Sequence, residues 1–360
     1  MSIFLMKQSP MQQAPLPAHR AARAMRKSSH GGNNYAVCTL DFLKERKFMK
    51  PFFKITLLSL SMFTVLLHSG SGQESWKRTV CPQSGYVYSL ALDSSGQIFA
   101  GTGANGVYYY KDNTWKAISS LLENIAAYTV IVDSKGHLFT GTDDGVFVSK
   151  NEGERWSEVS NGLKNEFINC LTINLTREII FAGTGGGGIF RSFDDGYNWY
   201  EVNNGLKDKA ILSLTTDKNN VIYAGTDKEG VFLSTDNGTT WKQIKEGLPI
   251  SSILSLTSTA SGYVFAGTRE GLYRLSNLDK EWFRIAKGIT AKSIYALTMS
   301  DGGKLYAGTD EGIFRSNDEG ITWIKDSEGM KNAAVISLLS GNGGYVYAGT
   351  NTGEVFIKKY

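Results

Sequence analysis

The sequence predicts an all-β fold, a seven-bladed β-propeller with four strands in each blade. A Gly-Thr dipeptide, usually preceded by Ala, marks seven repeats at intervals of 40 to 42 residues, a period typical of propeller blades. Each repeat contains short segments in which β-branched and aromatic residues alternate with polar ones, and no helical pattern of apolar residues competes with them. The seven tryptophans fall one to a repeat. The glycines that mark the repeats are Gly101, Gly141, Gly183, Gly225, Gly267, Gly308 and Gly349.

The repeat at residues 211–248 illustrates the four predicted strands. Strand A covers 211–215, strand B covers 221–224, strand C covers 231–234, and strand D opens at Trp241. Polar or glycine-containing turns separate these segments, as expected of antiparallel hairpins. Gly225 ends strand B, and we expect that a side chain there would obstruct the close approach of another backbone.

The turn between strands C and D carries the most specific motif, S-x-D-x-G-x-x-W. It occurs at residues 192–199, 234–241 and 316–323, and with Asn in place of Asp at 149–156. The motif predicts a hairpin in which the Asp or Asn accepts backbone N–H groups, the Gly takes a positive φ and the Trp covers the turn. The predicted structural residues are Asn151, Asp194, Asp236 and Asp318, together with Trp156, Trp199, Trp241 and Trp323.

This motif resembles the Asp-box, or BNR repeat, of sialidases, sortilin-type receptors, xyloglucan-degrading enzymes and photosystem II assembly factors. The whole unit is also similar to the propeller repeats of two-component sensor ectodomains. The resemblance covers roughly residues 75–360, and four turns carry the motif. Two repeats depart from it, because the turns at 110–115 and 276–282 are shortened. The resemblance implies a propeller fold.

The ring is predicted to close through the two ends of the repeat region. The last repeat ends after its strand C at 355–357, whereas residues 75–80 resemble a strand D with no strands A to C before it. Pairing this N-terminal strand D with the C-terminal strands A–C removes the exposed edges of an open array. Residues 73–360 are therefore the predicted propeller.

The first 72 residues lack the repeat. Residues 1–48 form a basic leader, and Met49 stands where a signal peptide would begin, which indicates a start codon placed too early. Residues 49–72 contain lysines, a short apolar run and small residues before a cleavage site near Gly72 and Gln73, as signal peptides do. We therefore expect a secreted or periplasmic protein with no membrane span after cleavage. The alternative is an uncleaved membrane anchor.

The mature part, residues 73–360, is slightly acidic. Residues 1–72 hold 10 of the 38 Lys and Arg and 2 of the 34 Asp and Glu, which leaves 28 basic and 32 acidic residues. Nucleic-acid binding needs a basic face, so we expect no nucleic-acid partner. Cys81 and Cys170 belong to blades that are not neighbours. We expect both to be unpaired, with Cys170 as a small core residue.

The mature part has no evident catalytic or metal-binding constellation. Its single histidine, His137, lies on an A–B turn, which argues against a His-based metal site or Ser-His catalysis. We expect no metal and no cofactor. Residues 183–188 superficially resemble a phosphate loop but precede a strand, so we expect a B–C turn. A sialidase needs converging arginines, whereas Arg191, Arg274 and Arg315 occupy equivalent positions on separate blades.

Polar residues of the B–C loops form the candidate ligand-binding site. The resemblance implies that the functional face carries the B–C and D–A loops, opposite the Asp-boxes. These residues either ring one mouth of the central channel or are solvated turn residues. A glycosidase needs two carboxyls at a defined separation, which a sequence does not give. The candidates are Asp143, Asp144, Asp227, Lys228, Glu229, Arg269, Glu270, Asp310, Glu311 and Asn351.

These observations predict an exported, monomeric and non-catalytic propeller that binds a protein or glycan partner. Short, uniform loops favour this hypothesis, because enzymes on such scaffolds build their pockets from loop insertions. One alternative is a BNR-type glycoside hydrolase similar to sialidases. Others are a sensory ectodomain separated from its signalling partner and an assembly factor similar to those of photosystem II. All of these functions rest on resemblance of fold.

Overall fold

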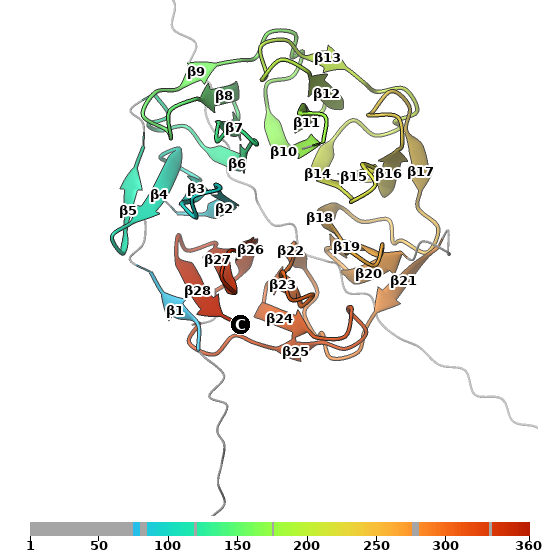
Figure 1. Cartoon of the computed structure of the whole chain (residues 1–360). Coiled ribbons are helices and arrows are strands. Elements are labelled where there is room, and N and C mark those ends of the chain that lie inside the picture. The colour runs from blue at the N-terminus through green and yellow to red at the C-terminus, as the bar shows by residue number, and fades with distance from the viewer. Residues whose placement is uncertain (1–74, 80–84, 119–120, 175, 276–280, 331–332) are drawn as a thin grey trace, which may run out of the picture. The chain divides into compact units, whose positions relative to one another are not determined.

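The computed structural model describes residues 75–79, 85–118, 121–174, 176–275, 281–330 and 333–360. The predicted leader, signal peptide and cleavage site lie outside the described residues, as does Cys81. The described residues form seven four-stranded antiparallel sheets, and Figure 1 shows these sheets as the blades of a closed ring. The predicted seven-bladed propeller is confirmed.

Each blade repeats the same strand order from the centre of the ring outward. The innermost strands A are β2 (Val87–Leu92), β6 (Ala127–Val132), β10 (Ile168–Asn174), β14 (Ile211–Thr216), β18 (Ile253–Ser258), β22 (Ile294–Met299) and β26 (Val335–Gly341). Strands B are β3 (Ile98–Thr102), β7 (Leu138–Thr142), β11 (Ile179–Thr184), β15 (Ile222–Thr226), β19 (Val264–Thr268), β23 (Leu305–Thr309) and β27 (Tyr345–Thr350).

Strands C are β4 (Val107–Lys111), β8 (Gly145–Ser149), β12 (Ile189–Ser192), β16 (Val231–Ser234), β20 (Gly271–Leu275), β24 (Gly312–Ser316) and β28 (Val355–Lys359). The outer strands D are β5 (Thr114–Ala117), β9 (Ser157–Glu158), β13 (Tyr200–Glu201), β17 (Lys242–Ile244), β21 (Trp282–Ile285), β25 (Ile324–Lys325) and β1 (Lys77–Arg78). Blades 1 to 6 contain β2–β5, β6–β9, β10–β13, β14–β17, β18–β21 and β22–β25, and blade 7 contains β26–β28 with β1.

The N-terminal strand closes the ring as predicted. Strand β1 pairs antiparallel with β28, with Lys77 opposite Ile357 and Arg78 opposite Phe356. The next residue, Thr79, donates both its backbone N–H and its hydroxyl to the carbonyl of Val355, at 2.9 and 2.8 Å. Blade 7 is therefore assembled from both ends of the repeat region.

A buried ion network lies beside this closure. Asp326 of blade 6 is 2% exposed and pairs with Lys358 of β28. Arg315 Nε lies 3.2 Å from Asp326 Oδ2. The backbone carbonyl of Asp326 accepts a 2.7 Å hydrogen bond from the indole N–H of Trp76. Removing one partner of a buried ion pair leaves a charge uncompensated and costs about 3–5 kcal/mol. The network therefore couples blade 6 to both strands of the closure.

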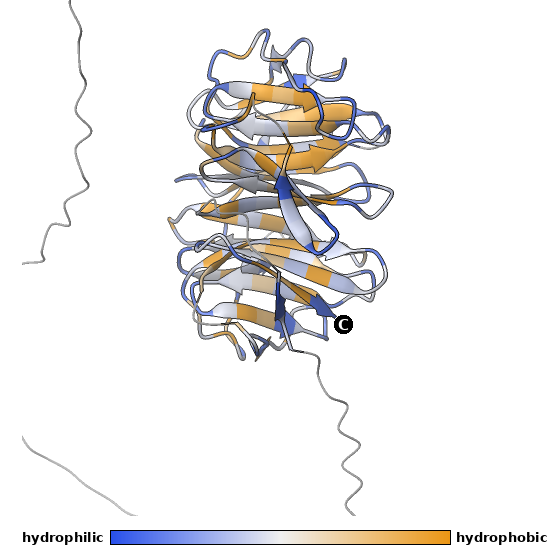
Figure 2. Cartoon of the chain, turned by 90° about the vertical axis from the view of Figure 1, so that its left-hand side faces the viewer, coloured by the Kyte–Doolittle hydropathy of each residue, from blue (hydrophilic) through white to orange (hydrophobic). Residues whose placement is uncertain are grey.

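The apolar core lies between neighbouring blades. In one such layer Phe181 and Ile189 of blade 3 pack against Ile211 and Phe232 of blade 4, and all four are buried. Figure 2 shows the result, with hydrophobic colour concentrated in the strands and hydrophilic colour in the turns. The described residues contain no helix long and apolar enough to cross a membrane.

The glycine next to the end of strand B meets the next blade, although at Gly225 the neighbouring atoms belong to side chains and not to the backbone that was expected. A Cβ added at Gly225 would lie 2.3 Å from Ser213 Oγ and 2.6 Å from Ile253 Cγ2, and Ile253 opens strand A of blade 5. The same contact at Gly349 reaches Val87 of blade 1, at 2.6 Å. Glycine is required here by space, because any side chain would separate two blades.

The tryptophans do more than cover their own turns. The indole N–H of Trp323 does bond within its turn, to the Gly320 carbonyl at 3.1 Å. In contrast, Trp241 donates to the carbonyl of Val202 in the preceding blade at 2.8 Å, and a Cβ added at Gly205 would lie 2.2 Å from the Trp241 carbonyl oxygen. The prediction that each Trp covers its turn was therefore incomplete. The Trp also joins two blades.

Candidate functional site

The Asp-box turns have the hydrogen bonds that the motif predicts. In the turn after β16, Ser234 donates to Asp236 Oδ1 at 2.7 Å and accepts the N–H of Gly238 at 2.8 Å. Asp236 also accepts the backbone N–H and the hydroxyl of Thr240, at 2.9 and 2.6 Å. Gly238 takes a φ of 81°, and Asn237 before it also takes a positive φ, of 55°.

Asn151 fills the same place in blade 2. Its Oδ1 accepts the Ser149 hydroxyl at 3.0 Å and the Arg155 N–H at 2.9 Å. The turn therefore needs an acceptor of this shape, and the negative charge is additional.

Hydrogen bonds within the Asp-boxes lower the pKa values of their carboxyl groups. Burial raises the pKa of Asp236, but hydrogen bonds from Thr240 and Ser234 outweigh it and lower that pKa to about 2. Hydrogen bonds from Thr322 lower the pKa of Asp318 to about 2 as well. Both carboxylates are therefore ionised through the whole physiological range, which suits a structural acceptor and not an acid catalyst.

Three candidate residues at equivalent positions in the B–C loops tie these loops to the D–A connections. Asp227 Oδ1 accepts the Ser252 hydroxyl at 2.7 Å. The backbone N–H of Ala334 donates to Asn351 Oδ1 at 3.2 Å, and the Asn351 N–H donates back to the Ala334 carbonyl at 3.0 Å. Asp310 faces the N–H of Ser293 at 3.4 Å.

Other candidates on this face have local partners too. Glu311 accepts the Thr290 hydroxyl at 2.8 Å, and Glu229 accepts the Gln243 amide at 2.9 Å. Three further candidates donate a backbone N–H to a nearby side chain: Lys228 to Asp208 Oδ2, Asp144 to Thr142 Oγ1 and Glu270 to Thr268 Oγ1. Arg269 makes no side-chain hydrogen bond or ion pair with any described residue. The face is thus a set of short, internally bonded loops.

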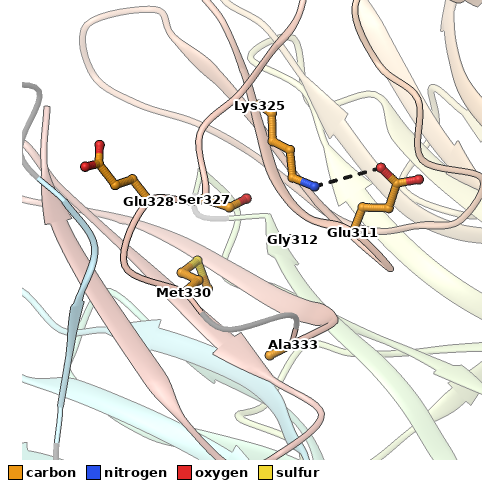
Figure 3. Close-up of a pocket in the computed structure, with 7 residues that line it drawn as sticks. All are labelled: Glu311, Gly312, Lys325, Ser327, Glu328, Met330 and Ala333. Atoms are coloured by element: carbon orange, nitrogen blue, oxygen red, sulfur yellow. Dashed lines mark ion pairs between the residues drawn. The ribbon is translucent and has the colours of Figure 1, made fainter.

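A cavity of about 300 Å³ lies on this face between blades 6 and 7, at the small end of the range for ligand pockets. Figure 3 shows Lys325 and Glu311 turned toward one another along one side, with their charged atoms 4.0 Å apart, and Met330 across from them. Ser327 is already occupied, because its Oγ accepts the N–H of Ile313 at 2.8 Å. The residues that line the cavity are Glu311, Gly312, Lys325, Ser327, Glu328, Met330 and Ala333.

Among the described residues, one group of three His, Cys or carboxylate side chains comes within metal-binding reach, namely Asp133, His137 and Asp195. It lies on the other face, where an A–B turn meets an Asp-box. His137 Nδ1 is 2.9 Å from Asp133 Oδ2, but Asp195 is held by the ammonium groups of Lys135 and Lys150, each at 3.2 Å. These two cations oppose a metal ion at the same carboxylate.

The strand-C arginines do not converge. Arg191 donates to the Asn237 carbonyl at 2.6 Å in the next blade, Arg274 lies over the Tyr263 ring at 4.7 Å, and Arg315 belongs to the buried ion network. The glycine-rich segment 185–188 joins β11 to β12, as predicted for a B–C turn.

Cys170 is a free, partly buried thiol, packed against Gly183. Burial raises the pKa of this thiol to about 12. It is therefore protonated at neutral pH, as expected of a small core residue.

An aromatic row, which the sequence analysis missed, crosses blades 1 to 3 near the start of their innermost strands. It consists of Tyr86, Tyr88, Tyr128 and Phe167. Successive ring centroids are 5.4, 5.2 and 5.1 Å apart. Tyr86 and Phe167, at the two ends, are 48% and 40% exposed. Aligning the seven repeats by strand A reveals this row, whereas scanning only loops and charges does not.

A family model described as Sortilin, neurotensin receptor 3 (Sortilin-Vps10) matches residues 144–249. No curated protein matches the chain by sequence. Among solved structures, the extracellular domain of BT4673 from B. thetaiotaomicron, described as a one-component system, is 18% identical with a TM-score of 0.69. The match covers 80% of this chain and 40% of that domain.

Two further structures match over nearly their whole length. A virginiamycin B lyase from Staphylococcus aureus with Quinupristin is 15% identical with a TM-score of 0.67, covering 79% of this chain and 99% of the lyase. YCF48 bound to D1 peptide is 14% identical with a TM-score of 0.66, covering 80% and 97%. At these identities the matches establish the fold alone. The family model over residues 144–249 agrees with the resemblance to sortilin-type propellers found in the sequence.

Proposed function

We propose that this chain is a non-catalytic binding module whose B–C and D–A loops contact a glycan or protein partner. The proposal rests on a contrast between the charged and the aromatic residues of this face. Carboxylates such as Asp227 and Glu311 already accept hydroxyl groups of neighbouring loops, whereas the aromatic row leaves Tyr86 and Phe167 about half exposed. Exposed aromatic side chains offer large contact area at low entropic cost, which suits binding.

A hydrolase is the less favoured hypothesis. Two carboxyls must flank the scissile bond in a glycosidase, but Asp227 and Glu311 each accept a hydroxyl from the neighbouring loop. The similar lyase is described as catalytically inactive after replacement of a histidine. In residues 73–360 the one histidine is His137, which lies beside an Asp-box, on the face opposite the B–C loops.

A peptide is the second candidate partner, because the similar YCF48 structure is described as bound to a peptide.

We also propose that residues 73–360 are the exported, mature protein. The apolar run before Gln73 supports this, and so does the description of the similar BT4673 domain as extracellular. N-terminal sequencing of the exported protein checks the cleavage site, and a start far from Gln73 contradicts it.

Incubation of residues 73–360 with soluble plant and bacterial polysaccharides, sialoglycans and peptide libraries tests the proposed function. Retention on one of these without a new product in mass spectrometry is the expected result. Release of a sugar in proportion to protein concentration would overturn the non-catalytic hypothesis and direct attention to Asp143, Asp227 and Asp310. Absence of binding to every glycan, peptide and protein probe would overturn the binding hypothesis itself.

A further inference from the structure

We infer that the aromatic row is a subsite for an uncharged oligosaccharide, built by a local departure of blades 1 and 3 from the repeat. This inference rests on the proposed binding function and specifies its ligand. Each structural position occurs once in every blade, so a departure confined to one sector of the ring is visible within this chain alone.

The first departure from the repeat is at the residue immediately before strand A. This position holds Tyr86 in blade 1 and Phe167 in blade 3, whereas the other blades have a small residue. The backbone carbonyls of both aromatics accept a hydrogen bond from the B–C loop of the same blade, from Gly103 at 3.0 Å and from Gly185 at 2.9 Å. The small residues of the other blades are Ala126, Ala210, Ser252, Ser293 and Ala334.

The second departure is that same loop position. It is glycine only in blades 1 and 3, and the other blades carry a larger polar residue there, namely Asp143, Asp227, Arg269, Asp310 and Asn351. A Cβ at Gly185 would lie 2.5 Å from Phe167 Cδ1, and one at Gly103 would lie 3.3 Å from Tyr88 Cε2. In blade 3 the aromatic residue before strand A therefore requires the glycine for a steric reason, whereas in blade 1 the glycine makes room for Tyr88 of the same row.

A bulge brings the middle of the row into line. Every strand A shifts register after its first residue, as between Val87 and Ser89 in β2 and between Ala127 and Thr129 in β6. The bulged residues in these blades are Tyr88 and Tyr128. Bulges redirect a side chain away from regular pairing, and here they place the two rings 5.2 Å apart across two blades.

The charges near the row disfavour an anionic ligand. Burial raises the pKa of Tyr128, and the negative charge of Asp143 raises it further, so this phenol is neutral beside a carboxylate. Among the described residues no lysine or arginine stacks on any of the four rings. An uncharged sugar presents an apolar C–H face to aromatic rings and hydroxyl groups to carboxylates and phenols, which matches both features.

The size of the row favours a sugar chain over a folded protein. Stable protein interfaces bury about 800 Å² on each partner and involve about 20–30 residues a side, whereas this row is four side chains on three blades. Strand addition by a peptide needs a free sheet edge. The row lies at the innermost strand of each sheet, which is itself a sheet edge, so the experiment must separate binding of a peptide from binding of a sugar.

Binding of uncharged hexaoses tests the inference. The probes are β-1,4-linked glucose, mannose and xylose hexaoses and an α-1,4-linked glucose hexaose, measured by calorimetry with residues 73–360. An anionic hexasaccharide and a proline-rich peptide are the comparison probes. The test variant is Tyr86→Ala with Phe167→Ala, which removes only half-exposed rings. The matched control is Phe193→Ala with Tyr200→Ala, another exposed aromatic pair, 6.4 Å apart, 56% and 55% exposed.

We expect at least one hexaose to bind, the test variant to bind it about tenfold or more weakly, as for loss of one stacking contact, and the control to bind it unchanged. Equal loss in both variants would overturn the placement at the row. Binding only of an anionic hexasaccharide or of a proline-rich peptide would overturn the neutral-sugar assignment while leaving the proposed binding function intact. Unchanged melting temperatures show that both variants are folded.

Discussion

Within an Asp-box, the shape of the side chain and its charge contribute separately. Asn151 and Asp236 accept the same two hydrogen bonds, from a Ser hydroxyl and from the backbone N–H four residues on. Asp236 adds a charge-assisted bond from Thr240 at 2.6 Å. Charge-assisted bonds are stronger than neutral ones, so the charged boxes provide this additional stabilisation only while they are ionised.

Acid should therefore weaken the propeller through its charged boxes. The folded pKa of Asp236 is about 2, below the unfolded value of about 3.9. Its contribution is thus complete above pH 4 and is lost as pH falls toward 2. We expect Asp236→Asn to reduce the slope of melting temperature against pH in this window, and Asn151→Asp to increase it. If the melting temperature fell with pH equally steeply in both variants and in the parent protein, this prediction would be wrong.

The thiol of Cys170 should be inert in the folded protein. The thiolate is the reactive form, and burial raises the pKa of this thiol to about 12. We expect iodoacetamide at pH 8 to leave Cys170 unmodified in the native protein and to modify it in urea, as located by peptide mass spectrometry. Native modification at the rate of an exposed thiol would show that this part of blade 3 opens.

At the scale of the strand, the glycine at the end of strand B controls how closely blades pack. We expect Gly225→Ala to destabilise the protein by about 1–3 kcal/mol, the usual cost of overpacking. Its new methyl group would meet Ser213 and Ile253. Gly302→Ala is the control, since its Cβ meets nothing closer than 3.6 Å. Urea unfolding measures both, and an equal effect of the two substitutions would argue against the packing explanation.

The strands and Asp-boxes were predictable because their signals are local. Alternation places strand C at 231–234, and the structure has β16 at Val231–Ser234. The aromatic row was not predictable in this way. It brings together Tyr88 and Tyr128 from different repeats, and their direction depends on bulges that no local pattern shows. The bonds of Asp227 and Asn351 were hidden for the same reason, because their partners lie on other loops.

For the whole ring, stability depends on one short strand from the N-terminal side. We expect deletion of residues 73–80 to lower the melting temperature strongly and to promote association, compared with a chain that begins at residue 73. The deletion removes the partner of β28 and the buried Trp76. Loss of a buried aromatic side chain alone costs about 3–5 kcal/mol, and an uncovered strand edge invites pairing with other chains. Unchanged melting would refute this closure.

The same closure sets an order of events during synthesis. Thr79 and Val355, which share two hydrogen bonds, are 276 residues apart in the chain. Contacts of such long separation form late, because the entropy of bringing distant segments together must be overcome first. Six blades can therefore be built from consecutive residues as they emerge, while the seventh waits until β28 exists. Until then β1 has no partner, and a stalled or shortened chain presents an incomplete ring to chaperones and proteases.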